Sequence, residues 1–303
     1  MKGLTPRNDK EREFMKIFDD LCYGQSRYKV WDDFVHMAAL SIVNTVDKTH
    51  FQEREERFQR IRKPYTEKQF MGFCSLLSTT TLALEENPFQ DFLGELYMRC
   101  DLGNDHAGQF FTPYHICEMM AKIIVSGDED LIRQEVKKRG YVSLCDPCIG
   151  GGAMMIGGAQ ALYGLGINYQ QDAVFIGQDI DPTVAMMAYI QLSLLGCPGY
   201  VVVGNSLTEP MTGHVLFGEG TERTYYTPMF FSEKMEFLRH MDIVREALIF
   251  PAIAAKAQAE AATDVPKIED LNQQADAPDK PHIVEISKKK GKAMAGQMMF
   301  SFE

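Results

Sequence analysis

Long apolar runs are absent from this chain of 303 residues. A membrane helix needs about 20 consecutive apolar residues, and no apolar segment here approaches that length. The N-terminal segment, Met1–Lys10, is polar and charged, so it lacks the apolar centre of a secretory signal peptide. The sequence therefore predicts a cytoplasmic protein with no membrane contact.

Positive charge is scarce as well. The chain has 31 Lys and Arg against 42 Asp and Glu, which gives a net charge of -11. A surface with this balance does not attract a polyanion over its whole area. If DNA is a partner, we expect the protein to reach it through a local patch or through a partner subunit.

A regular cysteine pattern is also missing. The seven cysteines are an odd number with irregular spacing, which argues against a disulfide framework. Cys145 and Cys148 have C-x-x-C spacing, but no second such pair and no paired histidines complete a zinc site. We predict no metal site and interpret these thiols as packing groups.

The patterns that are present predict three domains, namely a helical domain over residues 1–105, an α/β domain over 106–250 and a flexible tail over 251–303. In the first, Phe14, Ile17, Phe18 and Leu21 recur at helical spacing. Near its end, Asn87 followed by proline predicts a helix cap that opens a helix over residues 89–100. The tail is rich in Ala, Gln, Asp, Pro and Lys and has few large apolar residues.

The central region alternates short apolar runs with helical stretches. Strands are expected at Val142–Cys145, Val174–Ile176 and Tyr200–Val203, and helices at Ala153–Tyr163 and Pro182–Leu195. This order predicts an α/β fold with a parallel sheet and right-handed crossovers. After residue 205 the pattern decays, with weaker strand signals at 215–217 and 224–231.

Each predicted strand ends in residues suited to a nucleotide. The first leads into Asp146-Pro147-Cys148-Ile149-Gly150-Gly151-Gly152, where glycines allow close backbone approach to a ligand. The second ends at Asp179, which is placed to accept hydrogen bonds from a ribose diol, while Asp181 is placed to cap the next helix. The third leads to Asn205, whose amide oxygen suits an adenine amino group, although an asparagine here also suits a plain turn.

Together these segments resemble the adenine-specific N6 DNA methylase family, especially the modification subunits of type I restriction-modification systems. The most specific piece is Gly108-Gln109-Phe110-Phe111-Thr112-Pro113, which precedes the Asp-Pro-x-x-Gly-x-Gly turn as it does in that family. The resemblance implies a Rossmann-like S-adenosylmethionine-dependent methyltransferase fold with an incomplete parallel sheet. Two positions depart from the family pattern, because Ile149 replaces a cysteine and Asn205 replaces an aspartate.

The resemblance also implies the cofactor, S-adenosyl-L-methionine, and the residues that contact it. In the family the phenylalanine-Thr-Pro segment contacts the methionine end. The residues expected to bind the cofactor are Phe110, Phe111, Thr112, Pro113, Asp146, Pro147, Gly150, Gly152, Asp179 and Asn205. A dehydrogenase that binds NAD is disfavoured, since the Phe-Phe-Thr-Pro segment has no role there.

The family's catalytic tetrapeptide, Asn or Asp followed by Pro-Pro and an aromatic residue, is not found, and no Pro-Pro occurs in the chain. In the family its side-chain oxygen and the adjacent carbonyl accept the two hydrogens of the adenine amine, and its aromatic ring stacks on the flipped base. The nearest match in place is Thr227-Pro228-Met229-Phe230, which makes Thr227, Pro228 and Phe230 weak catalytic candidates. Asn87-Pro88-Phe89 has suitable chemistry but precedes the cofactor motifs.

The short region after residue 205 leaves too little chain for a full sheet. An unfinished sheet exposes an edge, so we expect an oligomer or an obligate partner subunit. The C-terminal segment Gln297–Phe302 resembles the peptides by which bacterial replication proteins dock on the sliding clamp. The alternative is that it adds to the protein's own sheet or lies unstructured.

Two functions stay open on the sequence alone. One is a DNA adenine-N6 methyltransferase whose catalytic residues come from the 224–231 segment or from another subunit. The other is a non-catalytic S-adenosylmethionine-binding or regulatory subunit of a restriction-modification or mobile-element system. The family resemblance favours the first, and the missing tetrapeptide favours the second.

Overall fold

The computed structural model describes residues 5–102, 111–245, 247 and 297–299. The part up to Glu236 forms one compact unit together with residues 297–299, and the chain from Phe237 belongs to a second unit. The division into three domains at residues 105 and 250 stays a prediction. In the described part, no helix has the length and apolar character needed to cross a membrane.

The N-terminal region is helical, as the apolar spacing predicts. Its helices are α1 (Asp9–Leu21), α2 (Arg27–Val46), α3 (Phe51–Arg62), α4 (Glu67–Glu86) and α5 (Phe92–Arg99). Asn8, Ser26 and Thr66 cap three of them, because each side chain accepts a hydrogen bond from a backbone N–H of the first turn. The helices pack through an aromatic centre in which Phe14 lies 5.8 Å from Trp31, centroid to centroid.

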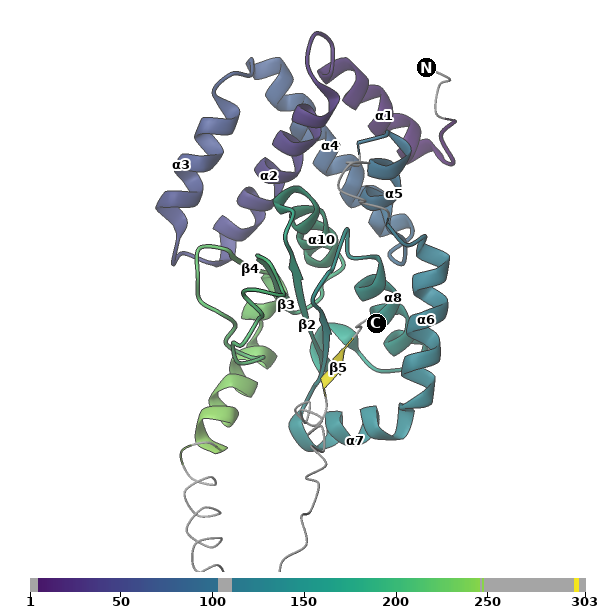
Figure 1. The fold of residues 1–303 in the computed structure, drawn as a ribbon, viewed down its shortest axis with the longest axis vertical. Coiled ribbons are helices and arrows are strands. Elements are labelled where there is room, and N and C mark those ends of the chain that lie inside the picture. Colours follow the sequence, from purple (N-terminus) through teal and green to yellow (C-terminus); the bar gives the residue numbers. More distant parts are fainter. Residues whose placement is uncertain (1–4, 103–110, 246, 248–296, 300–303) are drawn as a thin grey trace, which may run out of the picture. The chain divides into compact units, whose positions relative to one another are not determined.

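The remainder of the first unit is built on a sheet. Its strands are β1 (Val142–Asp146), β2 (Ala173–Asp179), β3 (Gly199–Val203), β4 (Thr224–Tyr226) and β5 (Gln297–Met299). They lie in the order β4-β3-β2-β1-β5 (Figure 1). β1, β2, β3 and β5 are parallel, and β4 runs antiparallel to β3. The predicted α/β class with a parallel sheet is confirmed.

Helices connect and flank the strands. They are α6 (Tyr114–Gly127), α7 (Glu129–Arg139), α8 (Ala153–Gly164), α9 (Tyr169–Asp172) and α10 (Pro182–Leu194). α10 is buried on all sides from Thr183 to Leu192, because it packs on the sheet on one side and on α2 on the other (Figure 1). Trp31 Nε1 donates to Met187 Sδ at 3.4 Å, and Thr183 Oγ1 donates to Asp32 Oδ1 at 2.6 Å. These contacts join the helical region to the carboxyl edge of the sheet.

Three local expectations are corrected. Asn87 ends α4 as its C-cap, and the next helix begins only at Phe92, because Asp91 supplies the N-cap. Residues 215–217 form a turn closed by a bridge between His214 and Gly218 instead of a strand. The 224–231 segment splits into β4 and a short 3-10 helix over Pro228–Phe231, because Pro228 begins a new turn.

The C-terminal segment joins the sheet in part. Residues 297–299 pair with Ser143–Cys145 and cover the outer edge of β1. This is the alternative in which the segment adds to the protein's own sheet. Residues 300–302 lie outside the described residues, and the expected sliding-clamp contact receives no support from the fold.

Candidate functional site

The predicted ligand residues meet at one edge of the sheet. β1 ends at Asp146, β2 ends at Asp179, and β3 is followed by Gly204 and Asn205. Since these strands are neighbours and parallel, their carboxyl ends lie side by side. Gly204 N donates to Asp179 O at 2.9 Å, which ties the tips of β2 and β3 together.

The glycine-rich loop after β1 folds back onto the tip of β2. Gly150 and Gly152 have φ values of +57° and +96°, which favour glycine over every residue with a Cβ. Gly150 N donates to Asp179 Oδ2 at 2.9 Å, and Ile149 N donates to Gln178 O at 2.9 Å. A Cβ on Gly152 would meet the Cα of Ala188 at 3.3 Å, so the glycine also lets the loop approach α10.

A buried hydrogen-bonded cluster holds this loop from behind. Gln191 Nε2 donates to Gly151 O and to Asp91 Oδ1, both at 2.8 Å, and its Oε1 accepts from Leu93 N at 3.0 Å. Asp91 Oδ1 also accepts from Gly94 N at 2.9 Å. Asp91 and Gln191 are 2% and 1% exposed, so these bonds have no competition from water. The shape of the loop therefore depends on α5 and α10 as well as on its own glycines.

The two carboxylates at the strand tips are both sheltered. Asp146 is 6% exposed, and its Oδ1 accepts from Cys148 N at 3.0 Å. Burial raises the pKa of Asp146 to about 6, and the neighbouring Asp179 charge pushes it the same way. Burial also raises the pKa of Asp179, whose Oδ1 accepts from Asp181 N at 3.0 Å. Two carboxylates with raised pKa values at one strand edge suit a ligand that brings positive charge or hydrogen-bond donors.

Asp181 has the role expected of it. Its Oδ1 accepts from Thr183 N at 2.9 Å and from Val184 N at 3.4 Å, and Pro182 takes the first helical position of α10. The separate prediction, that Asp179 meets a ribose, stays a prediction. A carboxylate has about four lone-pair sites, so the two backbone bonds to Asp179 leave it able to accept further hydrogen bonds.

The segment predicted to lie over the methionine end of a cofactor is adjacent to the glycine loop. The ring of Phe111 stacks on Tyr97 at 5.6 Å with 19° between the planes. A Cβ placed on Gly150 would come within 3.8 Å of Phe111. Cys117 Sγ donates to the Thr112 carbonyl at 3.6 Å, and Pro113 begins α6 as its N-cap. Phe110 lies outside the described residues.

Asn205 is in the turn that follows β3. Its Oδ1 accepts from Leu207 N at 2.9 Å, and its carbonyl accepts from Glu209 N at 2.7 Å. The first bond is that of an Asx-turn, so the turn interpretation of this residue is confirmed. The amide oxygen has a second lone pair, and the contact with an adenine amino group stays a prediction.

The sequence offers Thr227 as a weak catalytic candidate, but its side chain is not accessible to a substrate. It is 0% exposed, and its hydroxyl donates to Cys197 O at 2.6 Å and accepts from Gly199 N at 3.0 Å. Phe230 is 3% exposed and stacks on Tyr226 at 4.9 Å. Pro228 begins the 3-10 helix. These contacts give the segment a structural role at the start of β3, because the hydroxyl both donates to the backbone and accepts from it.

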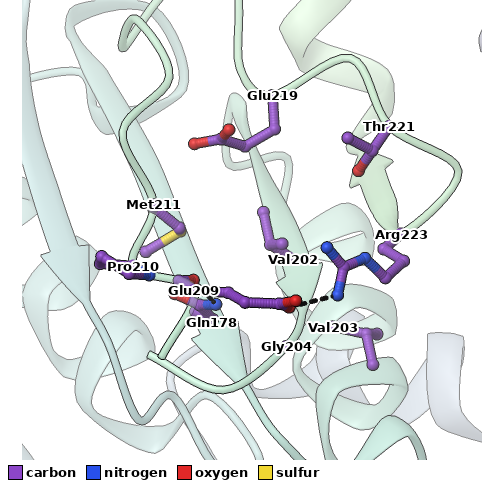
Figure 2. Close-up of a pocket in the computed structure, with 10 residues that line it drawn as sticks. All are labelled: Gln178, Val202, Val203, Gly204, Glu209, Pro210, Met211, Glu219, Thr221 and Arg223. Atoms are coloured by element: carbon purple, nitrogen blue, oxygen red, sulfur yellow. Dashed lines mark hydrogen bonds and ion pairs between the residues drawn. The ribbon is translucent and has the colours of Figure 1, made fainter. Parts of the chain in front are cut away.

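A pocket of about 100 Å³ lies under the loop that follows β3. Figure 2 shows Gln178 and Val202 from the strands facing Glu219 and Met211 from the loop. Gln178 is 1% exposed and donates to Glu209 O at 2.9 Å, while its Oε1 has no hydrogen-bond partner among the described residues. Arg223 pairs with Glu209 at the mouth (Figure 2).

Sequence patterns do not point to several residues that shape the site, namely Asp91, Tyr97, Gln178 and Gln191. Tyr97, Gln178 and Gln191 lie on helices or inside a strand, where their side chains have no local signature of a ligand site. Asp91 has the local signature of a helix cap only. Among the described residues, no group of three or more His, Cys, Asp or Glu is arranged to hold a metal ion.

Comparison with known proteins gives a family match. Residues 92–234 match the family model described as N-6 DNA Methylase. One similar solved structure is the type I restriction-modification system methyltransferase subunit from Streptococcus thermophilus, with 18% identity and a TM-score of 0.34. That match covers 65% of this chain and 40% of the other, so this chain spans well under half of that subunit.

A second similar structure, from Listeria monocytogenes, is described as a class I S-adenosylmethionine-dependent methyltransferase. It has 14% identity and a TM-score of 0.35, and the match covers 75% of this chain and 69% of that one. No curated protein sequence matches the chain.

Proposed function

We propose that this chain, whose residues 92–234 match the model of the N-6 DNA methylase family, binds S-adenosyl-L-methionine at the carboxyl ends of β1, β2 and β3. The observation that carries the proposal is the bond from Gly150 N to Asp179 Oδ2, which brings the glycine loop and a sheltered carboxylate to one place. Similar carboxyl edges of parallel sheets are where nucleotides bind.

The residues of this edge fit the chemistry of that cofactor. S-adenosylmethionine has an adenosyl group, a sulfonium that supplies the methyl group, and an amino-acid end with an ammonium. Asp146 and Asp179 provide negative charge beside Gly150, where a Cβ would project towards Phe111. Both carboxylates have raised pKa values, and a cationic ligand compensates for their burial.

Each predicted contact then has a role. Asp179 accepts hydrogen bonds from the ribose hydroxyls, and Asn205 accepts from the adenine amino group. Phe111 and Thr112 lie over the methionine end, with Phe110 and Pro113 beside them in the chain. Asp146 faces the same end from β1, and Pro147, Gly150 and Gly152 shape the backbone around it.

The proposed reaction is transfer of methyl to the N6 amine of adenine in DNA. The lone pair of that amine is conjugated into the ring, so the reaction needs an acceptor for the amine hydrogens at the moment of attack. The hydroxyl of Thr227 is committed to Cys197 and Gly199. We therefore propose that the acceptor comes from another subunit or a second copy of this chain, in a cytoplasmic restriction-modification or mobile-element system.

The alternative function is a regulatory subunit that binds S-adenosylmethionine without transferring methyl. The burial of Thr227 and Phe230 favours it, because these two side chains are then not accessible to a substrate. Both functions share the same cofactor site, so the first experiment concerns binding and the second concerns transfer.

Calorimetric titration of the whole chain with S-adenosylmethionine tests the shared site. We expect binding with one site per chain, and no heat with NAD. Absence of binding by the wild-type protein at millimolar cofactor would overturn the proposal.

Transfer of labelled methyl groups to DNA separates the two functions. The pure protein is assayed alone and then with an extract of its own cells, with an Asp179→Asn variant as the matched control. Label on adenine that needs both the extract and Asp179 supports a partner-dependent methyltransferase. Cofactor binding without label in either assay supports the regulatory function.

A further inference from the structure

A row of arginines on α3 stands out in a chain with a net charge of -11. Arg54, Arg57 and Arg60 are spaced three residues apart, so they are neighbours along one inclined row of the helix. All three line a groove of about 260 Å³ between α3 and the β3–β4 region. The groove is completed by Glu53, Pro182, Val203, Glu222, Arg223 and Tyr225.

Arg54 builds the wall of this groove. Its side chain is 4% exposed and forms an ion pair with Asp47 at 2.7 Å. Its Nη2 donates to Thr224 O at 3.0 Å, and its guanidinium lies 5.6 Å from the centre of the Tyr225 ring. These contacts fix α3 against β4, so the two arginines that follow are presented by a rigid support.

Arg57 and Arg60 are the cations that remain for a ligand. Arg57 is half-buried and donates one hydrogen bond, to the Tyr225 hydroxyl at 3.2 Å, and Arg60 is exposed. Within the described residues, neither has a carboxylate at ion-pair distance, whereas Arg223 is paired with Glu209. A half-buried guanidinium with unused donors is suited to an anion, since the planar fork matches the oxygens of a phosphate.

The groove lies next to the proposed cofactor site. Pro182 directly follows the cap residue Asp181, and Val203 pairs with Asp179 and precedes Gly204 and Asn205. Arg223 lines both this groove and the pocket of Figure 2. An anion held by Arg57 and Arg60 is therefore close to the strand tips that would bind the adenosyl group.

We propose that this groove binds a backbone phosphate of a nucleic-acid strand through Arg57 and Arg60. The proposal rests on the proposed function for the choice of nucleic acid, and on the groove itself for the anion. It explains how an acidic protein approaches a polyanion through a local patch. A volume of about 260 Å³ accepts a phosphate with its adjoining sugar, so the proposed contact is with the backbone of one strand.

Glu53 and Glu222 also line the groove and face the same ligand. Their charges repel a phosphate, so they limit the positions where it can lie and reduce its affinity. Replacing Glu222 by Gln should strengthen binding, whereas loss of the arginines should weaken it.

The test is fluorescence anisotropy with labelled 20-nucleotide DNA, single-stranded and duplex, over a salt series. The Arg57→Ala/Arg60→Ala variant is compared with Arg12→Ala/Arg133→Ala, which removes the same charge from exposed positions on α1 and α7. We expect about tenfold weaker binding for the first variant, and a salt slope smaller by about 1 for each phosphate that the protein no longer neutralises. The control should stay near the wild type.

Equal affinities and slopes for the two double variants would overturn the proposal, as would a wild-type protein that binds neither DNA at about 50 mM salt. Displacement of DNA by polyglutamate, charge for charge, would assign the groove to an acidic peptide instead. Melting curves report whether each variant is folded. Titration of the same variants with S-adenosylmethionine keeps the two proposals apart, because the groove variants should bind the cofactor as the wild type does.

Discussion

The glycine loop after β1 and the segment that begins with β4 both contact the same sheet, but they differ in whether their polar groups are already hydrogen-bonded within the protein. The loop has positive φ angles and an exposed Cys148. It lies beside the sheltered carboxylates of Asp146 and Asp179, which have unused lone pairs. The 224–231 segment is filled by aromatic packing, and the hydroxyl of Thr227 is bonded to the backbone. Hydrogen-bond acceptors that are still free can bind a ligand. Acceptors and donors that are already paired with the backbone stabilise the fold instead.

The largest effect is expected for Asp179→Asn. An amide has one acceptor oxygen and no charge, and Gly150 N and Asp181 N both need an acceptor here, so the acceptor sites proposed for the ribose diol are lost. Hydrogen bonds to charged groups contribute about 1.5–3 kcal/mol each, which corresponds to at least about tenfold weaker cofactor binding. Calorimetry measures the change. Unaltered affinity in a folded variant would place the ribose elsewhere.

Thr227→Val should lower the free energy of unfolding by about 1–3 kcal/mol, because it leaves Gly199 N and Cys197 O buried without a partner. Cofactor affinity should not change. Denaturant unfolding followed by calorimetry separates the two quantities. A variant that unfolds like the wild type but loses methyl transfer would restore Thr227 as a catalytic residue.

Gln191→Leu should weaken cofactor binding by about tenfold and also reduce stability, since Gly151 O and Leu93 N lose the hydrogen bond from or to Gln191, and Asp91 keeps only its bond from Gly94 N. The control is Gln170→Leu, which removes a bond from an exposed glutamine to Leu195 O and leaves the bonds of Gln191 in place. We expect that variant to bind the cofactor normally. If both variants lose the same affinity, the cluster has no particular influence on the loop.

The smallest effect concerns pH. The pKa of Asp146 is raised from an ordinary value of about 3.9 to about 6. Between these two pKa values, the folded protein retains a proton that the unfolded chain has released. The contribution of this carboxyl group to the free energy of unfolding therefore declines as the pH rises from the lower value to the higher one. Cofactor affinity should change in the other direction, rising severalfold towards pH 7, because a cationic ligand prefers the ionised carboxylate.

Asp146→Asn should remove the part of both pH profiles that belongs to this residue. Asp91, whose pKa burial also raises to about 6, contributes to the stability profile but not directly to binding. Thermal melts of the free protein and calorimetry from about pH 5 to about pH 7.5, the range that brackets the shifted value, give the two profiles. Parallel slopes for stability and affinity would contradict the assignment of Asp146 to the cofactor.

The sequence predicts the strand tips well because β-branched runs, glycines and acidic residues follow one another locally there. Val142, Val174 and Tyr200 fall within strands that the structure shows, and Asp181 caps α10 as expected. Long-range features are harder to predict. The hydrogen bond between Gln191 and Gly151 joins residues 40 apart in the sequence. No local pattern around either residue predicts that they are in contact. The addition of the C-terminal segment to the sheet is an alternative open on the sequence, but no pattern identifies β1 as the partner strand.

The short segments show a second limit. Asn87 precedes a proline, which is typical of a helix start, yet it ends α4 because the true start is capped by Asp91. Thr227 has the right place for a catalytic residue, but its burial depends on the packing of Tyr200, Tyr226 and Phe230 around it. Local propensity ranks such alternatives, and tertiary packing decides between them.

The hydrogen bonds of Gln191 have a consequence for dissecting the molecule. A fragment that starts at residue 140 would retain the three strand tips and every glycine of the loop, yet it would lack Asp91, Leu93 and Gly94. Its glycine loop would then lack the hydrogen bonds from α5 and its cap. If the proposed cofactor site is correct, the smallest fragment that binds the cofactor therefore has to begin ahead of the sheet, with α5 and Asp91.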